Sequence, residues 1–209
     1  MVFIMTDFKT PQENFWSGDF GLEYSKRVSD DRQVLSNIDM FSKIFKCTGK
    51  INSAVELGCN IGLNLRALNQ INPEINLTGY EINEYAVNIV NSLNIAKIEH
   101  DTILSPIKNE DKYDLSFTKV VLIHINPDEL ESVYENLYNL SNKYILVVEY
   151  YNPSPVTVSY RGNEDRLFKR DFAGEMIDKY NLRLLDYGFI YHRDNHFPLD
   201  DMTWFLMEK

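Results

Sequence analysis

Apolar residues along the chain occur either in short runs or at every third or fourth position. These two patterns alternate along the sequence, which predicts alternating strands and helices. Strands are predicted at 53–57, 75–80, 97–100, 113–118 and 144–148, and those at 53–57 and 144–148 are short apolar runs of the kind that form buried strands. Elsewhere apolar residues recur every three or four positions, which is the spacing of one helix face. This spacing predicts helices over 31–45, 63–68, 84–93, 127–140 and 172–180.

The order of these elements predicts the topology of the sheet. Strands that alternate with helices pair in parallel, and the helices cover both faces of the sheet. Two late runs, 184–191 and 202–207, have no helix between them and are expected to pair antiparallel. We therefore expect an α/β, Rossmann-like doubly wound, mostly parallel seven-stranded sheet with a terminal antiparallel hairpin.

Length and composition indicate a single globular domain over 1–209. The chain is 44% hydrophobic and 25% charged, and it contains no internal repeat or low-complexity tract. Two segments differ from the rest, a polar-aromatic segment within 1–30 and a basic loop at 150–171. No apolar run approaches the roughly 18 residues of a membrane span. The apolar run at 1–5 is too short for a signal peptide, so a cytoplasmic protein is expected.

Charge and cysteine content exclude several classes of partner. The formal net charge is −10, and so acidic a surface repels phosphate backbones, which argues against a nucleic-acid partner. Local arginines and lysines can still hold a small anion. Cys47 and Cys59 are too few for a disulfide framework and lack the spacing of metal ligands, so no metal is expected. No feature of the sequence indicates an oligomeric state.

The strongest local signal is the turn that follows the first strand, Glu56-Leu57-Gly58-Cys59-Asn60-Ile61-Gly62. Gly58 lets the backbone turn sharply and lets a ligand lie against it. Asn60 stands where the dinucleotide fingerprint needs its middle glycine, which disfavours a pyrophosphate ligand. The amino-acid tail of a nucleoside ligand suits the site better, with Glu56 orienting its ammonium group.

Two acidic residues follow the next two strands. Glu81 ends the second strand, 25 positions after Glu56, where a carboxylate can accept both hydroxyls of a ribose. Asp101 and Thr102 follow the third strand, where a carboxylate and a backbone N–H can hold an adenine edge. The alternatives are a solvated acid at a strand end for Glu81 and a helix or turn cap for Asp101.

Together, Glu56-x-Gly58, Glu81 and Asp101 resemble the class I S-adenosylmethionine-dependent methyltransferases. The terminal hairpin fits this resemblance, since it separates a methyltransferase sheet from an ordinary dinucleotide-binding sheet. The resemblance implies S-adenosylmethionine as cofactor and S-adenosylhomocysteine as product. The expected cofactor-binding residues are Trp16, Tyr24, Arg27, Glu56, Gly58, Asn60, Asn64, Glu81, Asp101, Thr102 and Lys119.

Further motifs narrow the resemblance to the methylases associated with pseudaminic acid biosynthesis, which are bacterial enzymes of surface-polysaccharide gene clusters. The likeness extends over about 10–209. The motifs are Phe15-Trp16-Ser17-Gly18-Asp19-Phe20-Gly21-x-x-Tyr24, Leu122-Ile123-His124-Ile125-Asn126-Pro127, Glu149-Tyr150-Tyr151-Asn152-Pro153, Tyr160-Arg161-Gly162 and Leu167-Phe168-Lys169-Arg170-Asp171-Phe172. This implies O-methylation of an anionic small molecule, a nucleotide-linked, phosphorylated or phosphoramidate-type precursor of a capsule or other surface glycan.

His124 is the candidate catalytic residue. It follows the fourth strand, at the sheet edge where ligands of such folds bind. The ordinary pKa of histidine suits a general base that takes a proton from an acceptor hydroxyl. The alternative is a histidine packed beside the cofactor with no proton to take.

The loop at 150–171 is the candidate acceptor site. It gathers four basic residues within an acidic chain, and arginine matches phosphate or carboxylate with two parallel hydrogen bonds. The expected substrate-binding residues are Tyr150, Tyr151, Asn152, Tyr160, Arg161, Lys169 and Arg170. The alternative is a solvated loop whose charges are compensated by Glu164, Asp165 and Asp171.

The segment 1–30 is expected to fold as a lid over the cofactor. Trp16 and Tyr24 would shield the sulfonium, and Arg27 would face the cofactor carboxylate, so that water is excluded. Ordinary core packing explains Phe15 and Phe20 equally well.

Three alternative functions stay open. An NAD-dependent dehydrogenase or epimerase is disfavoured by Asn60 and by the late hairpin. A non-catalytic cofactor-binding partner protein is disfavoured by the intact set of Gly58, Glu81 and Asp101. A methyltransferase acting on RNA or protein is the third alternative, and the net charge argues against RNA.

Overall fold

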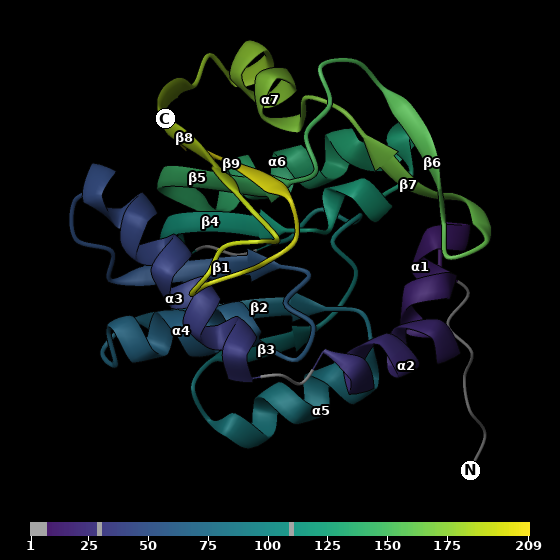
Figure 1. Ribbon diagram of the computed structural model, residues 1–209, viewed down its shortest axis with the longest axis horizontal. Helices are drawn as coiled ribbons and strands as arrows, with labels where there is room; N and C mark the ends of the chain where they lie inside the picture. The colour runs from purple at the N-terminus through teal and green to yellow at the C-terminus, as the bar shows by residue number, and fades with distance from the viewer. Residues whose placement is uncertain (1–7, 29–30, 109–110) are drawn as a thin grey trace.

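The computed structural model describes residues 8–28, 31–108 and 111–209. Its centre is a seven-stranded sheet with the strand order β3-β2-β1-β4-β5-β9-β8 (Figure 1). The strands are β1 (Ser53–Leu57), β2 (Asn76–Glu81), β3 (Lys97–His100), β4 (Tyr113–Lys119), β5 (Ser141–Glu149), β8 (Arg183–Ile190) and β9 (Met202–Glu208). The first five strands pair in parallel, whereas β9 pairs antiparallel with both β5 and β8. The predicted fold class is therefore confirmed.

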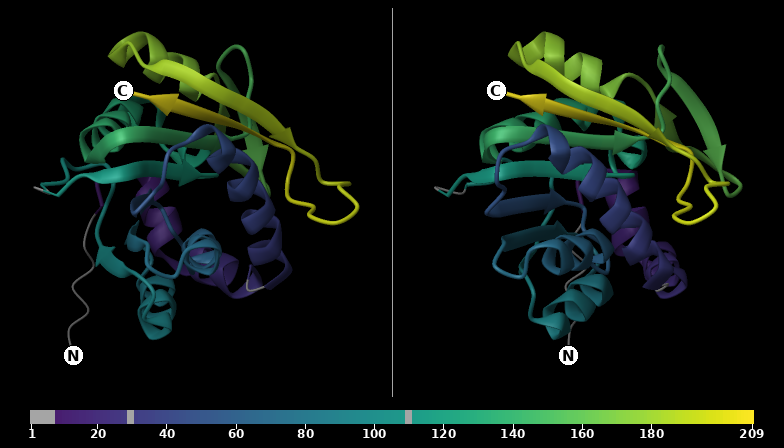
Figure 2. Two further views of the ribbon diagram at one scale, coloured as in Figure 1. Left: turned by 90° about the vertical axis from the view of Figure 1, so that its left-hand side faces the viewer. Right: turned by 60° about the vertical axis from the view of Figure 1, so that its left-hand side comes forward.

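Helices cover both faces of this sheet (Figures 1 and 2). The α-helices are α1 (Pro11–Ser17), α2 (Asp19–Arg27), α3 (Asp31–Ile44), α4 (Leu63–Ile71), α5 (Glu84–Leu93), α6 (Leu130–Leu140) and α7 (Phe172–Tyr180). The short 3-10 helices are η1 (Phe45–Cys47), η2 (Leu122–His124) and η3 (Pro127–Glu129). The helix expected over 127–140 thus begins with the 3-10 turn η3. There Pro127 lies in the first turn and the side chain of Asn126 accepts the N–H of Asp128.

The alternation of side chains along each strand divides the core into two layers. Val55 and Leu57 of β1 pack with residues of α6 and α7 on one face. Ala54, the residue before Val55, packs with residues of α3 and α4 on the other face. Both faces of β5 are covered in the same way, so residues 144–148 form a continuous apolar run, which is why the sequence pattern located this strand.

One segment differs from its expectation. The loop expected at 150–171 contains two antiparallel strands, β6 (Val156–Tyr160) and β7 (Asn163–Lys169), which form a hairpin outside the main sheet. Its two-residue turn, Arg161 and Gly162, has φ values of 50° and 79°. Two consecutive residues with positive φ form the hairpin turn whose twist matches that of the flanking strands. Glycine at the second position adopts its positive φ without steric strain.

The N-terminal helices α1 and α2 lie beside the carboxyl ends of β1, β2 and β3 (Figure 1). The side chain of Asn83, which begins α5, donates a hydrogen bond to the carbonyl of Trp16 at 3.0 Å. Gly21 packs so closely on this carbonyl that a Cβ would lie 1.8 Å from its oxygen. Residues 1–7 and 29–30 of the expected lid, and with them the apolar run at 1–5, lie outside the described residues.

Over the described part of the chain, no helix combines the length and the apolar character needed to cross a membrane. Within 8–28, 31–108 and 111–209, no three His, Cys, Asp or Glu side chains are grouped so that they could hold a metal ion.

Candidate active site

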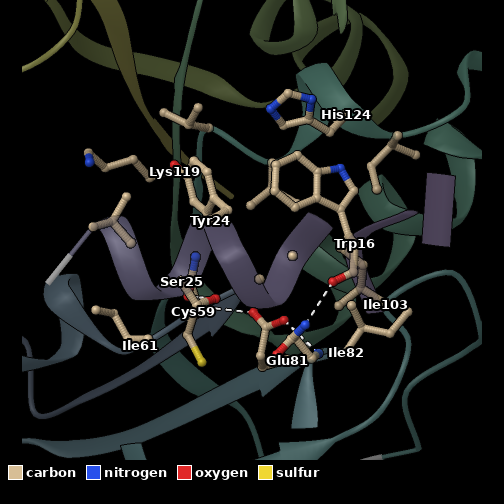
Figure 3. Close-up of a pocket in the computed structure, with 18 of the residues that line it drawn as sticks. Trp16, Tyr24, Ser25, Cys59, Ile61, Glu81, Ile82, Ile103, Lys119 and His124 are labelled. Atoms are coloured by element: carbon tan, nitrogen blue, oxygen red, sulfur yellow. Dashed lines mark hydrogen bonds between the residues drawn. The ribbon is translucent and has the colours of Figure 1, made fainter. Parts of the chain in front are cut away.

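A cavity of about 640 Å³ opens at the carboxyl edge of the sheet. Its size is within the range of small-molecule sites. Its walls come from α1 and α2, from the turns after β1, β2, β3 and β4, from the β6–β7 hairpin and from the loop 191–201. Glu81 lies on one side, His124 and Lys119 lie on the other, and Trp16 and Tyr24 lie between them (Figure 3).

The turn after β1 has the conformation that its sequence predicts. Gly58 and Gly62 have φ values of 79° and 76°, and a Cβ at Gly58 would lie 2.6 Å from the Val121 side chain. Asn60 also has a positive φ, 44°, which asparagine tolerates better than most residues. Its side-chain oxygen accepts a hydrogen bond from Ser25 of α2 at 2.8 Å, so the turn and α2 are joined.

Glu81 is held with its carboxylate at the cavity wall. One oxygen accepts the backbone N–H of Asn60 at 2.7 Å, and the other accepts that of Asn83 at 2.8 Å (Figure 3). Burial raises the pKa of Glu81, and the backbone N–H groups oppose this rise. A carboxylate oxygen has about two acceptor sites, so each Glu81 oxygen keeps one for a ligand.

Glu56 lies behind the cavity wall. It is fully buried, and its Oε1 accepts a hydrogen bond from Asn64 at 2.5 Å, while its Oε2 has no partner. Burial raises the pKa of Glu56 to about 8. Asn64 itself lines the cavity, and its Oδ1 also has no partner. The pair therefore holds two side-chain oxygens without a hydrogen-bond partner at the inner end of the site.

Lys119 ends β4 on the same side of the cavity. Burial lowers its pKa, while the negative charges of Glu56, Asp200 and Glu149 act in the opposite direction. Lys119 therefore lies within electrostatic range of the Glu56 carboxyl, whose Oε2 has no hydrogen-bond partner.

Asp101 and Thr102 line the opposite end of the cavity. Asp101 accepts the N–H of Thr102 at 2.7 Å, so this carboxylate is partly engaged within its own turn. The Thr102 hydroxyl donates to the Glu13 carboxylate of α1. Glu13 lines the cavity too, and the sequence analysis did not identify it. Its sequence signal, Thr10-x-x-Glu13, indicates a capping box at a helix start, which the structure contains.

His124 has one ring nitrogen engaged inside the protein. Its Nδ1 lies 2.7 Å from the carbonyl oxygen of Arg166, an atom that can only accept, so Nδ1 carries the proton and Nε2 is an acceptor. Burial lowers the pKa of His124 to about 4. The ring packs against Trp16 and Tyr160, with centroid distances of 4.6 Å and 4.9 Å.

The structure brings most of the expected cofactor-binding residues together. Those that line the cavity are Trp16, Tyr24, Gly58, Asn60, Asn64, Glu81, Asp101, Thr102 and Lys119. Arg27 does not line it, because it is exposed at the end of α2. The lid residues Trp16 and Tyr24 thus face the cavity, whereas the arginine expected beside them does not.

The expected acceptor residues divide into two groups. Tyr150, Tyr160 and Arg161 line the cavity. Arg170 lies outside the cavity and pairs with Glu175 at 2.6 Å. Lys169 also lies outside it, with its Nζ over the ring of Tyr150, 5.2 Å from the ring centroid. Tyr151 and Asn152 also lie outside the cavity lining. The basic residues of this segment therefore do not form one cluster.

The loop 191–201 contributes residues that the sequence analysis did not identify. Asp200 and His192 line the cavity, and Asp200 accepts a hydrogen bond from the Tyr150 hydroxyl at 2.7 Å. No local pattern marks Asp200, because its hydrogen-bond partner Tyr150 is 50 positions away in the chain.

No protein-family model matches the chain, and no curated protein sequence matches it significantly. Solved structures do match. The plantazolicin methyltransferase BpumL in complex with SAH has a TM-score of 0.67 at 16% identity, over 95% of this chain and 94% of that one. The magnesium protoporphyrin IX methyltransferase ChlM from Synechocystis PCC 6803 with bound SAH has a TM-score of 0.67 at 13% identity, over 94% and 97%.

A third similar structure is an S-adenosylmethionine-dependent methyltransferase from Clostridium acetobutylicum ATCC 824. Its TM-score is 0.63 at 13% identity, over 90% of this chain and 97% of that one. At such identities the likeness shows that the chain shares the fold of these three structures, and it shows no more than the fold.

Proposed function

We propose that the chain is an S-adenosylmethionine-dependent methyltransferase that binds its cofactor between the turn at Gly58 and the N-terminal helices. The observation that carries the proposal is the carboxylate of Glu81, held at the cavity wall by two backbone N–H groups with one acceptor site left on each oxygen. Two adjacent ribose hydroxyls are the donors that such a pair of acceptors fits. Similar folds crystallised with SAH or SAM support this choice of cofactor.

The remaining cavity fits the other parts of this cofactor. Asn64 Oδ1 and Glu56 Oε2 are buried oxygens without partners, which suits an ammonium group once Glu56 ionises, and Lys119, within electrostatic range of Glu56, suits a carboxylate. Ile103 and Leu104 line the cavity next to Asp101 and supply the apolar surface that an adenine ring needs. A Cβ at position 58 would force the Val121 side chain to move, so the close packing of Val121 on the turn after β1 needs glycine at this position.

When bound, the cofactor supplies an electrophilic methyl group on a sulfonium. The protein has to align an acceptor oxygen with it, exclude water and remove the acceptor's proton. Trp16 and Tyr24 cover the middle of the cavity and exclude water. Nε2 of His124 accepts the proton, and the carbonyl of Arg166 fixes the ring through Nδ1.

The proposed acceptor is a small molecule with an anionic group, and the resemblance of the sequence motifs directs the search to nucleotide-linked or phosphorylated sugars of surface-glycan synthesis. Arg161 carries this part of the proposal, because it lines the cavity beside Tyr160 and its guanidinium lies over that ring, 5.7 Å from the centroid. Tyr150 and Asp200 add a hydroxyl and a carboxylate that can orient sugar hydroxyls.

Calorimetric titration of the purified chain with SAH tests the cofactor, with NAD as the control nucleotide. We expect saturable binding of SAH and none of NAD. Mass spectrometry then tests the reaction, with labelled S-adenosylmethionine, a panel of nucleotide-linked and phosphorylated sugars, and their neutral counterparts. Absence of SAH binding would overturn the proposal, and methylation of only the neutral sugars would overturn the anionic acceptor.

A further inference from the structure

Glu149 is a buried carboxylate that the proposed mechanism does not use. It ends β5, is 2% exposed and does not line the cavity. Its Oε1 accepts the backbone N–H groups of both Val121 and Leu122, each at 2.8 Å. These N–H groups lie at the start of η2, where a helical turn has no internal acceptors for them, so the carboxylate caps this turn.

The loop that Glu149 caps has a strained start. Val120 has a φ of 57°, in the left-handed region that β-branched residues rarely adopt. Such a conformation persists only where the surroundings determine it. The N–H of Val120 donates to the carbonyl of Val148 at 2.9 Å, so β5 holds the loop at two adjoining positions, Val148 and Glu149.

The same loop contributes to both halves of the candidate site. The Val121 side chain packs against Gly58 in the cofactor turn. His124 follows three residues later, and its N–H donates to the carbonyl of Val121 at 2.8 Å. A displacement of Val121 would therefore change the wall beside the cofactor and the position of the His124 ring together.

We propose that Glu149 is a positioning residue, whose carboxylate fixes the loop 120–124 so that the His124 ring stays in its place against Trp16 and Tyr160. The role assigned to that ring rests on the proposed function. The position of the ring does not, and it can be measured without cofactor or acceptor.

The ionisation of Glu149 supports this role. Burial raises its pKa to about 7, while the N–H groups of Val121, Leu122 and Ile123 and the charge of Lys119 oppose the rise. The titratable groups that face it are Lys119 of β4 and Tyr134 of α6, and Lys119 also faces Glu56 and Asp200. Protonation below about pH 7 removes the negative charge that strengthens both hydrogen bonds.

Proton NMR of the His124 ring in the full cofactor-free chain tests the proposal. The ring lies against two aromatic side chains, so its Hε1 signal reports its position, and the spectrum of His124→Gln assigns it. In the parent we expect this signal to shift between about pH 6 and pH 8, one unit on either side of the pKa of Glu149. The pKa of His124 itself lies at about 4, outside this interval, whereas that of Glu56 lies at about 8, so each titration is carried out in a Glu56→Gln background and the shift that remains there is the one assigned to Glu149.

In Glu149→Ala we expect the signal to be displaced at about pH 8, and in Glu149→Gln we expect the pH-dependent shift to be lost. Asp114→Asn is the matched control, because Asp114 also accepts a backbone N–H, that of Asn52 at 2.8 Å, at the opposite end of β4. A folded Glu149→Ala with the parent's signal would overturn the proposal. If Glu149→Ala does not fold, a pH-dependent shift that persists in Glu149→Gln overturns it. SAH calorimetry on the parent tests the proposed function separately.

Discussion

The hydroxyl of Thr102 donates a hydrogen bond to the carboxylate of Glu13, and this contact joins the first helix of the chain to the turn after β3. The second oxygen of the same carboxylate accepts the N–H of Thr10 at 2.9 Å. Glu13 therefore closes the start of α1 and attaches that helix to the wall of the cavity. Because both Glu13 and Thr102 line the cavity, the attachment of α1 and the binding of a nucleoside are expected to depend on one another.

Replacement of Glu13 by Ala should loosen this attachment. The Thr10 N–H and the Thr102 hydroxyl both lose their acceptor, which should lower the free energy of unfolding by about 1–3 kcal/mol. SAH affinity should fall as well, because one wall of the cavity is less ordered. Urea unfolding and calorimetry measure the two effects. Glu23→Ala on α2, an exposed residue paired only with Lys26, is the control and should change neither.

Glu81→Gln should weaken SAH binding by about 2 kcal/mol, the scale of hydrogen bonds to a charged acceptor. In this variant one carboxylate oxygen is replaced by an amide NH2 group, which cannot accept a hydrogen bond from a ribose hydroxyl. Calorimetry measures the loss, with Glu99→Gln on the neighbouring strand as control, since Glu99 pairs with Lys97 outside the cavity. If Glu81→Gln binds SAH as the parent does, the ribose lies elsewhere.

The pH dependence of cofactor binding should report the ionisation of Glu56. Its pKa is raised from 4.5 to about 8, so the folded chain without cofactor holds this proton up to about pH 8. An ammonium group next to Glu56 favours the ionised form, and binding then releases a proton. SAH affinity should therefore rise with pH, by up to about tenfold per unit, and level off above about pH 8. Calorimetry over this range checks the slope, which Glu56→Gln should abolish.

The pattern of apolar residues predicted the main sheet well, because its central strands β1, β2, β4 and β5 are largely buried and its helices have one apolar face. The hairpin of β6 and β7 was missed for a physical reason. Its second strand, Asn163–Lys169, is rich in charged residues, and its turn is Arg161-Gly162 rather than Asn-Gly. Three charged residues, 164–166, precede its two buried apolar residues, Leu167 and Phe168, so the strand shows no apolar alternation.

The candidate site was predicted where it depends on strand ends and was not predicted where it depends on distant contacts. Gly58, Glu81 and Asp101 follow consecutive strands, so sequence order alone brings them to one edge. Asp200 reaches the cavity through the β8–β9 loop, and Glu13 reaches it through the packing of α1. The partner of Arg170, Glu175, lies on the next helix, and its sequence position does not show that it neutralises this arginine.

His124→Asn should lower kcat by about 10²–10⁴-fold if Nε2 takes the acceptor's proton, with little change in SAH affinity. The pKa of His124 is lowered to about 4, so the neutral imidazole that can accept a proton dominates at every pH well above 4. Loss of rate through protonation of His124 should therefore appear only in that acid range. Rate measurements with the acceptor found by the sugar panel test this, with His196→Asn, outside the cavity lining, as control. Full turnover by His124→Asn would assign the ring to packing alone.

Two arginines of the segment 150–171 allow a paired test of the anionic acceptor. Both are candidates by sequence, but Arg161 lines the cavity, whereas Arg170 lies outside it and is paired with Glu175 at 2.6 Å. Arg161→Gln should therefore raise the KM for an anionic acceptor by about tenfold, the equivalent of about 1.4 kcal/mol, and leave SAH affinity unchanged. Arg170→Gln should leave both values unchanged.

Neutral acceptors provide the last comparison between these arginines. If Arg161 binds an anionic group, the KM of a neutral sugar should be the same in Arg161→Gln and in the parent, because the missing hydrogen bonds were never made. An equal rise in KM for charged and neutral acceptors would mean that Arg161 shapes the cavity wall, through its position over the ring of Tyr160, rather than binding an anion. A rise in Arg170→Gln that matches the rise in Arg161→Gln would instead mean that the acceptor leaves the cavity and extends along the outer side of β7.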